Sequence, residues 1–455
     1  MSDASTRPAD TIIVGGGASG VLVASQLLRR SCGRHRIAIV EPAPELARGA
    51  AYSTPHPGHL LNVVAGRMSA FEDRPDDFVR FLVDHDGGDA AAHSRRFAPR
   101  RDYGRYLRAT LEAQPGSERI EWIRDAASGI GVRPDGVEVA LASGERVRAG
   151  NLVLAIGNAP KHLAALAPER LPGLAQADAW DYASIAAIAP REDIAILGSG
   201  LSMVDVVVAL ADAGHQGRIH VVSRHGLLPL PHAEYGPHSG GVEALAKLGL
   251  PARMRLLREW VVEAQSAGQP WQWVMDRLRP HGAQLWQTLD DAGQRRFLRH
   301  AVRYWDIHRH RIAPRIHALV SGLLGSGQLQ VHAGRLADIE PGERATLEIA
   351  LRDGGRATLA VDRLVNATGI ETQSARSPHP LVRALLASGA IAPGPHGIGL
   401  ATDDDGRLRD RDGRVAPNAY TLGSARVGQL WESIAIPELR VQAEAIAGAI
   451  LAHDG

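Results

Sequence analysis

The chain has 455 residues, a formal net charge of +1 at pH 7 and hydrophobic residues at 45% of its positions. This length indicates two or three domains, with enough apolar material for a core in each. A net charge so close to zero argues against nucleic acid or an anionic membrane surface as a partner. No uncharged apolar run is long enough to span a membrane, and the N-terminal residues do not resemble a secretory signal. We therefore expect a cytoplasmic protein.

The first predicted strand leads directly into a glycine-rich turn. Residues 11–14 are Thr-Ile-Ile-Val, and residues 15–20 follow with the pattern Gly-x-Gly-x-x-Gly. These glycines permit a tight turn into a helix, close approach of the backbone to a pyrophosphate, and close packing of helix on strand. A second apolar strand ends in Glu41, at the position where an acidic residue binds a ribose hydroxyl. We predict that this unit binds the ADP part of FAD through Gly15, Gly17, Ala18, Ser19, Gly20 and Glu41.

A second glycine-rich turn follows the apolar strand at residues 193–197. It begins Gly-Ser-Gly, but Met203 stands where the third glycine is expected, so helix and strand should pack less tightly here. The next strand, at 218–222, is followed by a hydroxyl, a guanidinium and an imidazole instead of a carboxylate. These groups suit a 2′-phosphate, although an exposed loop with ordinary surface charge is the alternative. We predict that this unit binds NADPH through Gly198, Ser199, Gly200, Leu201, Ser202, Ser223, Arg224 and His225.

Two fingerprints in one polypeptide imply two nucleotide cofactors, which usually means that a nicotinamide reduces a flavin. Apolar strands also end in glycine at 151–157 and 363–369, each after a stretch that alternates like a β-meander. We therefore predict an α/β fold with two Rossmann-like dinucleotide-binding domains, the NADPH domain being inserted in the FAD domain. The predicted boundaries are 1–190 for the first part of the FAD domain, 191–369 for the NADPH domain and 370–455 for the return to the FAD domain.

The region from about 239 to 322 has the pattern of several amphipathic helices rich in Leu, Arg and Trp. We expect this insert to cover the flavin and form the substrate pocket, although tryptophans at helical spacing more often belong to a core. Its end is rich in groups that can bind a carboxylate, and the substrate candidates there are Trp305, His308, His310 and Arg311. A solvated basic helix is the alternative. No third ligand of suitable spacing accompanies the histidines, so no metal is predicted.

The sequence contains a single cysteine, Cys32. A dithiol–disulfide reductase needs a redox-active pair of cysteines, so this class is excluded within one chain. We expect Cys32 to be a buried structural thiol at the end of the first helix. The electrons must then pass to oxygen, a quinone, a small molecule or a partner protein.

Together with the two fingerprints, five further stretches resemble a broad bacterial family of FAD/NAD(P)-binding flavoproteins with two dinucleotide-binding domains. They are residues 51–54, 61–63 with 68–69, 222–229, 304–311, and 430–432 with 436–440. Some longer relatives are flavin monooxygenases that hydroxylate the amine of an amino acid, including a nitrosuccinate-forming type that oxidises aspartate. The resemblance implies hydroxylation of a nitrogen of a small amino-acid-like substrate by O2, through a C4a-hydroperoxyflavin.

The resemblance also implies which further residues contact the cofactors. They are Tyr52, Asn62, Met68, Ser69, Gly157, Thr368, Gly369, Gly423 and Trp431. Glu432 is expected to contact the flavin or the substrate, and a helix beginning near residue 436 is expected to point its N-terminus at the flavin. No side chain is assigned an acid–base role, because the flavin carries the difficult chemistry.

Two departures from related families narrow the prediction. Residues 171–181 lack the Phe and His of the Baeyer–Villiger motif Phe-x-Gly-x-x-x-His-x-x-x-Trp, and Trp180 is displaced by one position, so ketone oxygenation is not expected. The final glycine is followed by Ser424 instead of the Asp that binds the ribityl chain in many relatives. Two other functions stay open: an NADPH dehydrogenase or reductase acting on a quinone or small acceptor, and a flavin-binding electron-relay subunit that needs a protein partner. The substrate and the oligomeric state also stay open.

Overall fold

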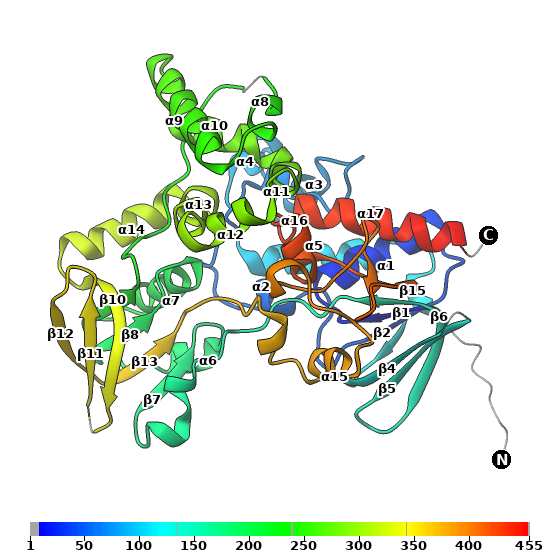
Figure 1. Cartoon of the computed structure of the whole chain (residues 1–455), viewed down its shortest axis with the longest axis horizontal. Coiled ribbons are helices and arrows are strands. Elements are labelled where there is room, and N and C mark those ends of the chain that lie inside the picture. Colours follow the sequence, from blue (N-terminus) through cyan, green and yellow to red (C-terminus); the bar gives the residue numbers. More distant parts are fainter. Residues whose placement is uncertain (1–8, 134, 238–239, 343, 454–455) are drawn as a thin grey trace. The chain divides into compact units, whose positions relative to one another are not determined.

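The computed structural model describes residues 9–133, 135–237, 240–342 and 344–453, which form two compact units (Figure 1). Unit 1 comprises Met1–Ser53, Val63–Ala159 and Glu371–Gly455, and unit 2 comprises Thr54–Asn62 and Pro160–Ile370, as far as these residues are described. This division places the segments 54–62 and 160–190 in unit 2, whereas the sequence-based boundaries place them in the FAD domain. The assignment of one cofactor to each domain stays a prediction.

Unit 1 is built on a sheet in which parallel pairing dominates. The strand order is β14-β15-β6-β1-β2-β3, and β4 and β5 extend the sheet from β6 by antiparallel pairing. The strands are β1 Ala9–Val14, β2 Ile37–Val40, β3 Glu121–Ile123, β4 Ala127–Arg133, β5 Gly136–Leu141, β6 Arg146–Leu154, β14 Arg407–Arg409 and β15 Val415–Thr421. The helices are α1 Ala18–Arg30, α2 Gly49–Tyr52, α3 Asp77–Asp86, α4 Ala90–Arg95, α5 Arg100–Glu112, α15 Pro380–Ser388, α16 Val427–Leu430 and α17 Ile436–His453.

The centre of the unit 1 sheet is buried on both faces. Ile12 and Ile13 point to opposite faces of β1, and both are fully buried. Helix α1 packs against α17 and α5, and these helices bury the apolar residues of α1 such as Leu22 and Leu27. A parallel strand that is covered on both faces needs apolar side chains at every position, which explains why the sequence shows continuous apolar runs here.

Unit 2 contains a second sheet with a parallel centre. Its strand order is β12-β11-β10-β9-β8-β13-β7; the pairs β10–β11 and β11–β12 are antiparallel, and the other pairs are parallel. The strands are β7 Ala175–Asp178, β8 Ile194–Leu197, β9 Ile219–Ser223, β10 Leu329–Glu340, β11 Ala345–Leu351, β12 Arg356–Val361 and β13 Arg363–Asn366. The helices are α6 Tyr182–Ala186, α7 Leu201–Asp212, α8 Glu243–Ala246, α9 Leu250–Ser266, α10 Trp271–Leu278, α11 Gly282–Gln287, α12 Asp291–His300, α13 Val302–Arg309 and α14 Pro314–Gly325.

The helical insert of unit 2 has a core of its own. Val242, Leu245, Leu278 and Leu285 are buried together, and Trp305 packs against this cluster. The helices α8–α14, green to yellow-green in Figure 1, correspond to the region predicted at 239–322, whose first residue lies outside the described ranges. The predicted α/β class, with two parallel-dominated sheets and a helical insert, is confirmed.

Cys32 does not occupy the buried position that we expected. Helix α1 ends at Arg30, and the chain then turns through Cys32 at φ 51° and Gly33 at φ 73°. This turn leaves the Cys32 side chain exposed. The expectation of a buried thiol was wrong because the helix ends before the cysteine, so its buried face does not extend that far.

Candidate dinucleotide-binding sites

The first glycine loop has no room for side chains where the chain turns from β1 into α1. Gly15 has φ +107°, and a Cβ there would lie less than 3.0 Å from the carbonyl oxygen of Ala155. A Cβ on Gly20 would meet the carbonyl oxygen of Gly15 just as closely. Gly17 caps α1 without a side-chain hydrogen bond, and the first turn of the helix holds no acidic residue. The free N–H groups and positive end of α1 therefore suit a pyrophosphate.

Glu41 braces this loop from the end of β2. One carboxylate oxygen accepts a hydrogen bond from the Gly16 N–H at 2.8 Å, and the other accepts from the Ala43 N–H at 2.9 Å. A carboxylate offers about four acceptor positions, so Glu41 can also accept ribose hydroxyls. Its position beside the loop fits the predicted contact with the adenosine ribose.

Two further predicted glycines lie at the same end of the unit 1 sheet. Gly157 follows β6 at φ +66°, and a Cβ there would meet no atom within 4 Å. Gly423 follows β15 at φ +69°, and a Cβ there would lie 3.4 Å from the Ser19 hydroxyl oxygen. The Ser424 hydroxyl donates to the Gly157 carbonyl oxygen at 2.9 Å. The C-terminal segment thus returns to the start of α1, as an FAD-binding domain requires.

The other residues that the resemblance assigned to FAD differ in their surroundings. Tyr52 is buried with its ring centroid 4.9 Å from that of Tyr103, and burial raises its pKa. Met68 and Ser69 are also buried, and the Ser69 hydroxyl donates to the Arg74 carbonyl oxygen at 2.6 Å. Asn62 belongs to unit 2. The side chains of Tyr52, Met68 and Ser69 therefore take part in the internal packing of unit 1.

Trp431 has a strained backbone just before α17. Its φ of 61° and ψ of −67° close a γ-turn, in which the Glu432 N–H donates to the Leu430 carbonyl oxygen at 2.7 Å. This turn is rare for a residue with a side chain and costs about 1–3 kcal/mol. The Glu432 side chain that follows is buried. Such strain is often found at functional sites, and here it fixes where the predicted flavin neighbour Trp431 stands relative to α17.

The second glycine loop, between β8 and α7, has the same backbone turn as the first, but different side chains hold it in place. A Cβ on Gly198, at φ +106°, would lie less than 3.0 Å from the carbonyl oxygen of Ala367, whereas a Cβ on Gly200 would meet nothing within 4 Å. Gly200 caps α7 without a side-chain hydrogen bond. The Ser199 hydroxyl oxygen lies 2.8 Å from that of Ser223, so a hydroxyl pair joins this loop to the end of β9.

Thr368 and Gly369 follow β13, the strand next to β8. The Thr368 hydroxyl donates to the Asn366 side-chain oxygen at 2.7 Å, and Gly369 has φ +89°. A small pocket at this sheet end is lined by Ser202 of α7 as well as by Gly369. The structure therefore brings the predicted residues of the second loop and of the β13 end together within unit 2.

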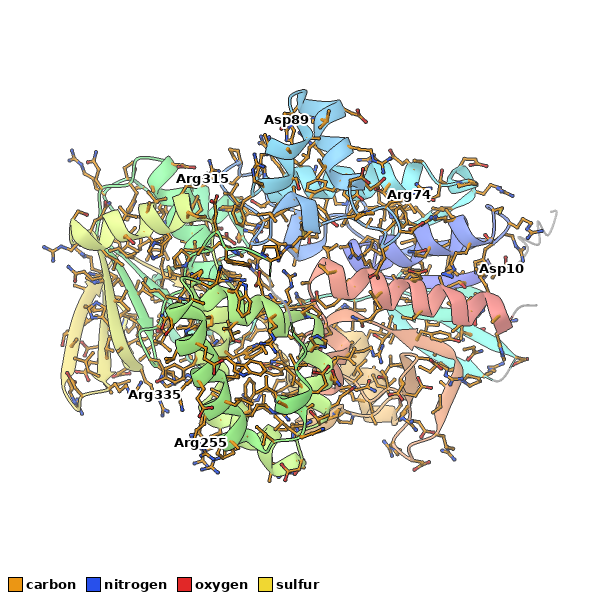
Figure 2. All side chains as sticks on the ribbon, turned by 90° about the horizontal axis from the view of Figure 1, so that it is seen from above. Asp10, Arg74, Asp89, Arg255, Arg315 and Arg335 are labelled. Atoms are coloured by element: carbon orange, nitrogen blue, oxygen red, sulfur yellow. The ribbon has the colours of Figure 1, made fainter. Side chains whose placement is uncertain are left out.

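A cluster of basic side chains lies beyond the end of β9. Burial, followed by repulsion from Arg303 and Arg335, lowers the pKa of the Arg224 guanidinium. His225 Nδ1 lies 2.8 Å from the Arg352 guanidinium, and burial with the surrounding arginines lowers the pKa of His225. Figure 2 labels Arg335 on β10. We call Arg224, His225, Arg303, Arg335 and Arg352 the basic cluster.

Sequence reasoning found two members of the basic cluster and missed three. Arg303 lies on α13, Arg335 on β10 and Arg352 after β11, all far in sequence from β9. Arg335 and Arg352 reach it because β10 pairs with β9, with Ala333 opposite Ser223, and because the Arg352 N–H donates to the Ala333 carbonyl oxygen at 2.8 Å. Arg303 reaches it because α13 runs alongside the chain after β9, where the Leu230 N–H donates to the Ile307 carbonyl oxygen. No local pattern around these arginines indicates that contact, so only the three-dimensional packing could have identified them.

The substrate candidates near the end of the insert are engaged in its packing. The Trp305 ring centroid lies 6.0 Å from that of Phe297, and His308 lies 4.7 Å from Trp271 by the same measure. Arg311 is buried and forms an ion pair with the buried carboxylate of Asp276. His310 is half-buried directly after α13. The Arg311 guanidinium therefore binds a carboxylate of this chain. Its surroundings are buried, whereas the alternative prediction for this stretch was a basic helix exposed to solvent.

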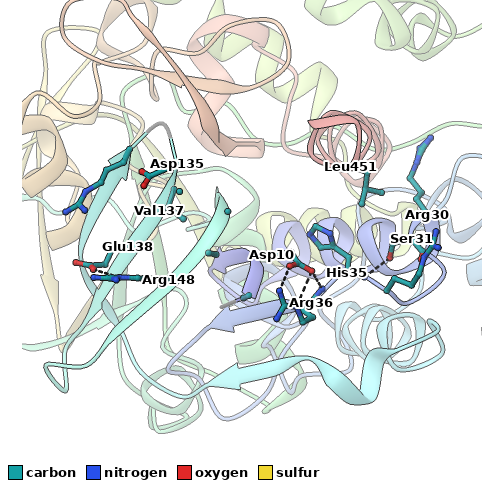
Figure 3. Close-up of a pocket in the computed structure, with 16 residues that line it drawn as sticks. Asp10, Arg30, Ser31, His35, Arg36, Asp135, Val137, Glu138, Arg148 and Leu451 are labelled. Atoms are coloured by element: carbon teal, nitrogen blue, oxygen red, sulfur yellow. Dashed lines mark hydrogen bonds and ion pairs between the residues drawn. The ribbon is translucent and has the colours of Figure 1, made fainter. Parts of the chain in front are cut away.

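A cavity of about 940 Å³ opens at the other end of the unit 1 sheet (Figure 3). It is lined by Asp10 at the start of β1 and by His35 and Arg36 before β2. Arg36 and Asp10, which both line it, form an ion pair at 2.7 Å. Gly15 follows the opposite end of β1, and dinucleotides bind beyond the carboxyl ends of parallel strands. This cavity is therefore separate from the glycine loops.

Membrane and metal features complete the description. Within the described ranges, no helix is both long and apolar enough to cross a bilayer. The same residues contain no group of three His, Cys, Asp or Glu side chains arranged to hold a metal ion.

Comparisons with known proteins match part of the chain to a family model and nearly all of it to a known fold. Residues 12–159 match a family model described as FAD-NAD(P)-binding. No curated protein matches the chain. The solved structure of ornithine N-hydroxylase from Kutzneria sp. 744 matches with a TM-score of 0.69 at 15% identity, over 98% of this chain and 100% of that one.

Two further solved structures show how widely the fold is used. The reduced ornithine hydroxylase of Pseudomonas aeruginosa matches with a TM-score of 0.67 at 19% identity, over 98% of this chain and 100% of that one. The bacillithiol disulfide reductase of Bacillus cereus matches over the same shares with a TM-score of 0.56 at 16% identity. The chain therefore carries an FAD-NAD(P)-binding domain in residues 12–159, and it has the fold of flavoproteins with two dinucleotide-binding domains, a fold that N-hydroxylating flavin monooxygenases share.

Proposed function

We propose that the protein is an FAD-dependent, NADPH-consuming monooxygenase that hydroxylates a nitrogen of a small amino-acid-like substrate. One observation carries the proposal: a glycine loop follows a parallel strand in both units, and the next strand is followed by the carboxylate of Glu41 in unit 1 and by the basic cluster in unit 2. An unphosphorylated and a 2′-phosphorylated dinucleotide fit this difference. The fold shared with two ornithine hydroxylases supports nitrogen as the oxidised atom.

The residues of unit 1 fit FAD. Gly15, Gly17 and Gly20 leave the start of α1 open to a pyrophosphate, and Glu41 has acceptor capacity for ribose hydroxyls. Gly157 leaves open space where the chain passes the same sheet end. Bound FAD, once reduced by NADPH, supplies the activation of O2 that no side chain provides.

The residues of unit 2 fit NADPH. Gly198 and Gly200 open the start of α7, and Thr368 and Gly369 border the same end of the sheet. In the described part of the chain, neither Arg224 nor Arg335 has a carboxylate partner, so a phosphate of the coenzyme would neutralise both.

The proposed reaction inserts one atom of O2 into an N–H bond of the substrate to give a hydroxylamine. The other oxygen atom leaves as water, and NADPH with one proton supplies the two electrons and the hydrogens. Only a neutral amine offers a lone pair for this bond, so the ammonium form must first lose a proton. Glu432, which is buried and follows the strained Trp431, is the substrate candidate of unit 1. His310 is the further substrate candidate that the structure leaves half-buried.

The test supplies the purified yellow protein with NADPH, ¹⁸O₂ and a panel of amino acids and diamines. We expect NADPH oxidation that rises with one amine, and a hydroxylamine product that carries ¹⁸O in about the amount of NADPH consumed. Fast NADPH oxidation with quinones and no ¹⁸O in any product would instead identify a reductase. No NADPH oxidation by the isolated chain would identify a relay subunit that needs a protein partner.

A further inference from the structure

We propose that Arg303, on the helical insert, joins Arg224 and Arg335 in binding the 2′-phosphate of the coenzyme, so that NADPH fastens the insert to the unit 2 sheet while NADH does not. The inference rests on the proposed use of NADPH and adds that the bound coenzyme connects the helical insert to the unit 2 sheet. All the residues that carry it belong to unit 2.

The first step is the register of the two neighbouring strands. Ala333 of β10 stands opposite Ser223, the last residue of β9. Arg335 lies two positions further on the same face of β10, since side chains alternate along a strand. A Cβ on Gly226 would lie 3.1 Å from the Ala333 Cβ, so the chain after β9 stays close to β10. Arg224 and Arg335 are therefore held beside the place where a bound adenosine ribose ends.

The second step is the attachment of α13 to the loop after β9. The Leu230 N–H donates to the Ile307 carbonyl oxygen at 3.3 Å, and the Ile312 N–H donates to the Leu230 carbonyl oxygen at 3.0 Å. The Tyr304 ring centroid lies 6.4 Å from that of His225. Helix α13 therefore runs alongside the residues that follow β9, and it carries Arg303 to the basic cluster.

The third step is the charge of the cluster. Arg303 pairs with Asp306 at 3.0 Å in a half-exposed contact, and exposed pairs of this kind contribute little. Within the described residues, this is the only ion pair that any arginine of the basic cluster forms. Repulsion among these arginines contributes to the lowered pKa of Arg224. A dianionic phosphate bound by Arg224, Arg303 and Arg335 would reduce that repulsion.

The fourth step connects Arg303 to the rest of the insert. Trp305, two residues further along α13, packs against the insert core around Leu278 and Leu285. A phosphate held by Arg303 and Arg335 would therefore restrain α13 and its neighbouring helices against the sheet. NADH lacks this group and makes no such connection.

The experiment measures amide hydrogen exchange in the full chain with FAD bound, with saturating NADP⁺, with saturating NAD⁺ and without coenzyme. In the wild type we expect NADP⁺ to slow exchange in peptides covering 302–309 about tenfold, and NAD⁺ to leave it unchanged. Arg303→Gln should raise the Kd for NADP⁺ about tenfold and abolish the slowing at saturation. Arg335→Gln should raise the Kd similarly and keep the slowing, because Arg303 still holds the phosphate.

Arg295→Gln is the matched control, since Arg295 also lies on the insert and pairs with Asp291 one turn away. We expect it to change neither the Kd nor the exchange. Unchanged Kd and exchange response in Arg303→Gln would overturn the inference while NADPH use stands. Equal Kd values of the wild type for NADP⁺ and NAD⁺ would overturn the proposed NADPH use, and the inference with it.

Discussion

The two glycine loops share a backbone turn and differ in the side chains that hold it. In unit 1 the third glycine, Gly20, has no room for a Cβ, whereas Met203 is fully buried at the same position in unit 2. In unit 1 a carboxylate braces the loop, whereas in unit 2 a hydroxyl pair does so beside a basic cluster. We therefore expect the turn to bind a dinucleotide and the side chains at the end of the next strand to determine which dinucleotide is bound.

The largest expected effect tests the feature that the loops share. Gly15→Ala and Gly198→Ala each place a Cβ against a carbonyl oxygen at positive φ, which costs about 3 kcal/mol or more. We expect Gly15→Ala to be purified without FAD, and Gly198→Ala to keep FAD but lose reduction by NADPH. The ratio of flavin to protein absorbance measures bound FAD, the loss of flavin absorbance after NADPH is added without oxygen measures its reduction, and urea unfolding measures the cost in stability.

Gly448→Ala serves as the control for these variants. A Cβ on Gly448 meets nothing within 4 Å inside α17, so alanine should stabilise the helix by about 0.5–1 kcal/mol. Loss of FAD in both Gly15→Ala and Gly198→Ala would contradict separate sites for the two cofactors.

The second effect concerns acid, to which the two units should respond differently. Burial, and then the charge of Arg311, lowers the pKa of His232 in unit 2 to about 4. The unfolded value is about 6.5, so the unfolded state binds more protons below that pH. Stability is therefore lost as the pH falls from about 6.5 to about 4, by up to about 3 kcal/mol. His220 and His332 of the same unit also have pKa values lowered by burial.

Tryptophan fluorescence is the probe for this effect, because six of the eight tryptophans belong to unit 2. We expect it to report unfolding at a higher pH than flavin absorbance does. His232→Asn, which keeps a donor for the Asn62 carbonyl oxygen, should reduce the difference. Coincident transitions in the wild type would mean that the units unfold together.

The third effect concerns the side chains that hold the two glycine loops, namely Glu41 in unit 1 and Ser223 in unit 2. In Glu41→Gln an amide NH₂ would face one of two backbone N–H groups that now donate to the carboxylate, which costs about 1–3 kcal/mol. We expect FAD to dissociate at least tenfold more readily, as measured by equilibrium dialysis. Ser223→Ala should leave FAD binding unchanged. An equal loss of FAD in Ser223→Ala would contradict the prediction that only the unit 1 loop binds FAD.

The smallest effect tests the choice of coenzyme. Arg224→Gln removes one charge from the 2′-phosphate site, so the KM for NADPH should rise about tenfold while kcat is unchanged. The KM for NADH should not change. Steady-state NADPH and NADH oxidation measures this, and a parallel rise in both KM values would argue that Arg224 contacts another part of the coenzyme.

The sequence alone predicted the parts of the fold that local patterns encode. Both strand–glycine–helix turns, Glu41 at the end of β2 and the helical insert follow from apolar runs and spacing over a few tens of residues. The contacts that could not be predicted join residues that are far apart in the sequence. Arg335 reaches the end of β9 through strand order, Arg303 reaches it through the packing of α13, and Arg311 is paired with Asp276 of α10.

The grouping of segment 54–62 with unit 2 also depends on distant packing. It lies between stretches of unit 1, yet His59 of this segment binds the Asp205 carbonyl oxygen of α7 at 2.9 Å. Nothing in its own composition indicates that contact.

Unit 1 is formed by segments that are separated in the sequence, and this affects its folding during synthesis on the ribosome. Unit 2 is complete once residue 370 has emerged, whereas unit 1 still lacks β15 and α17 at that point. Strand β15 pairs with β6, and α17 packs against α1, so the half of the protein that is begun first is finished last. Until then one edge of β6 and one side of α1 need protection from other nascent chains, and early termination would leave both exposed to aggregation.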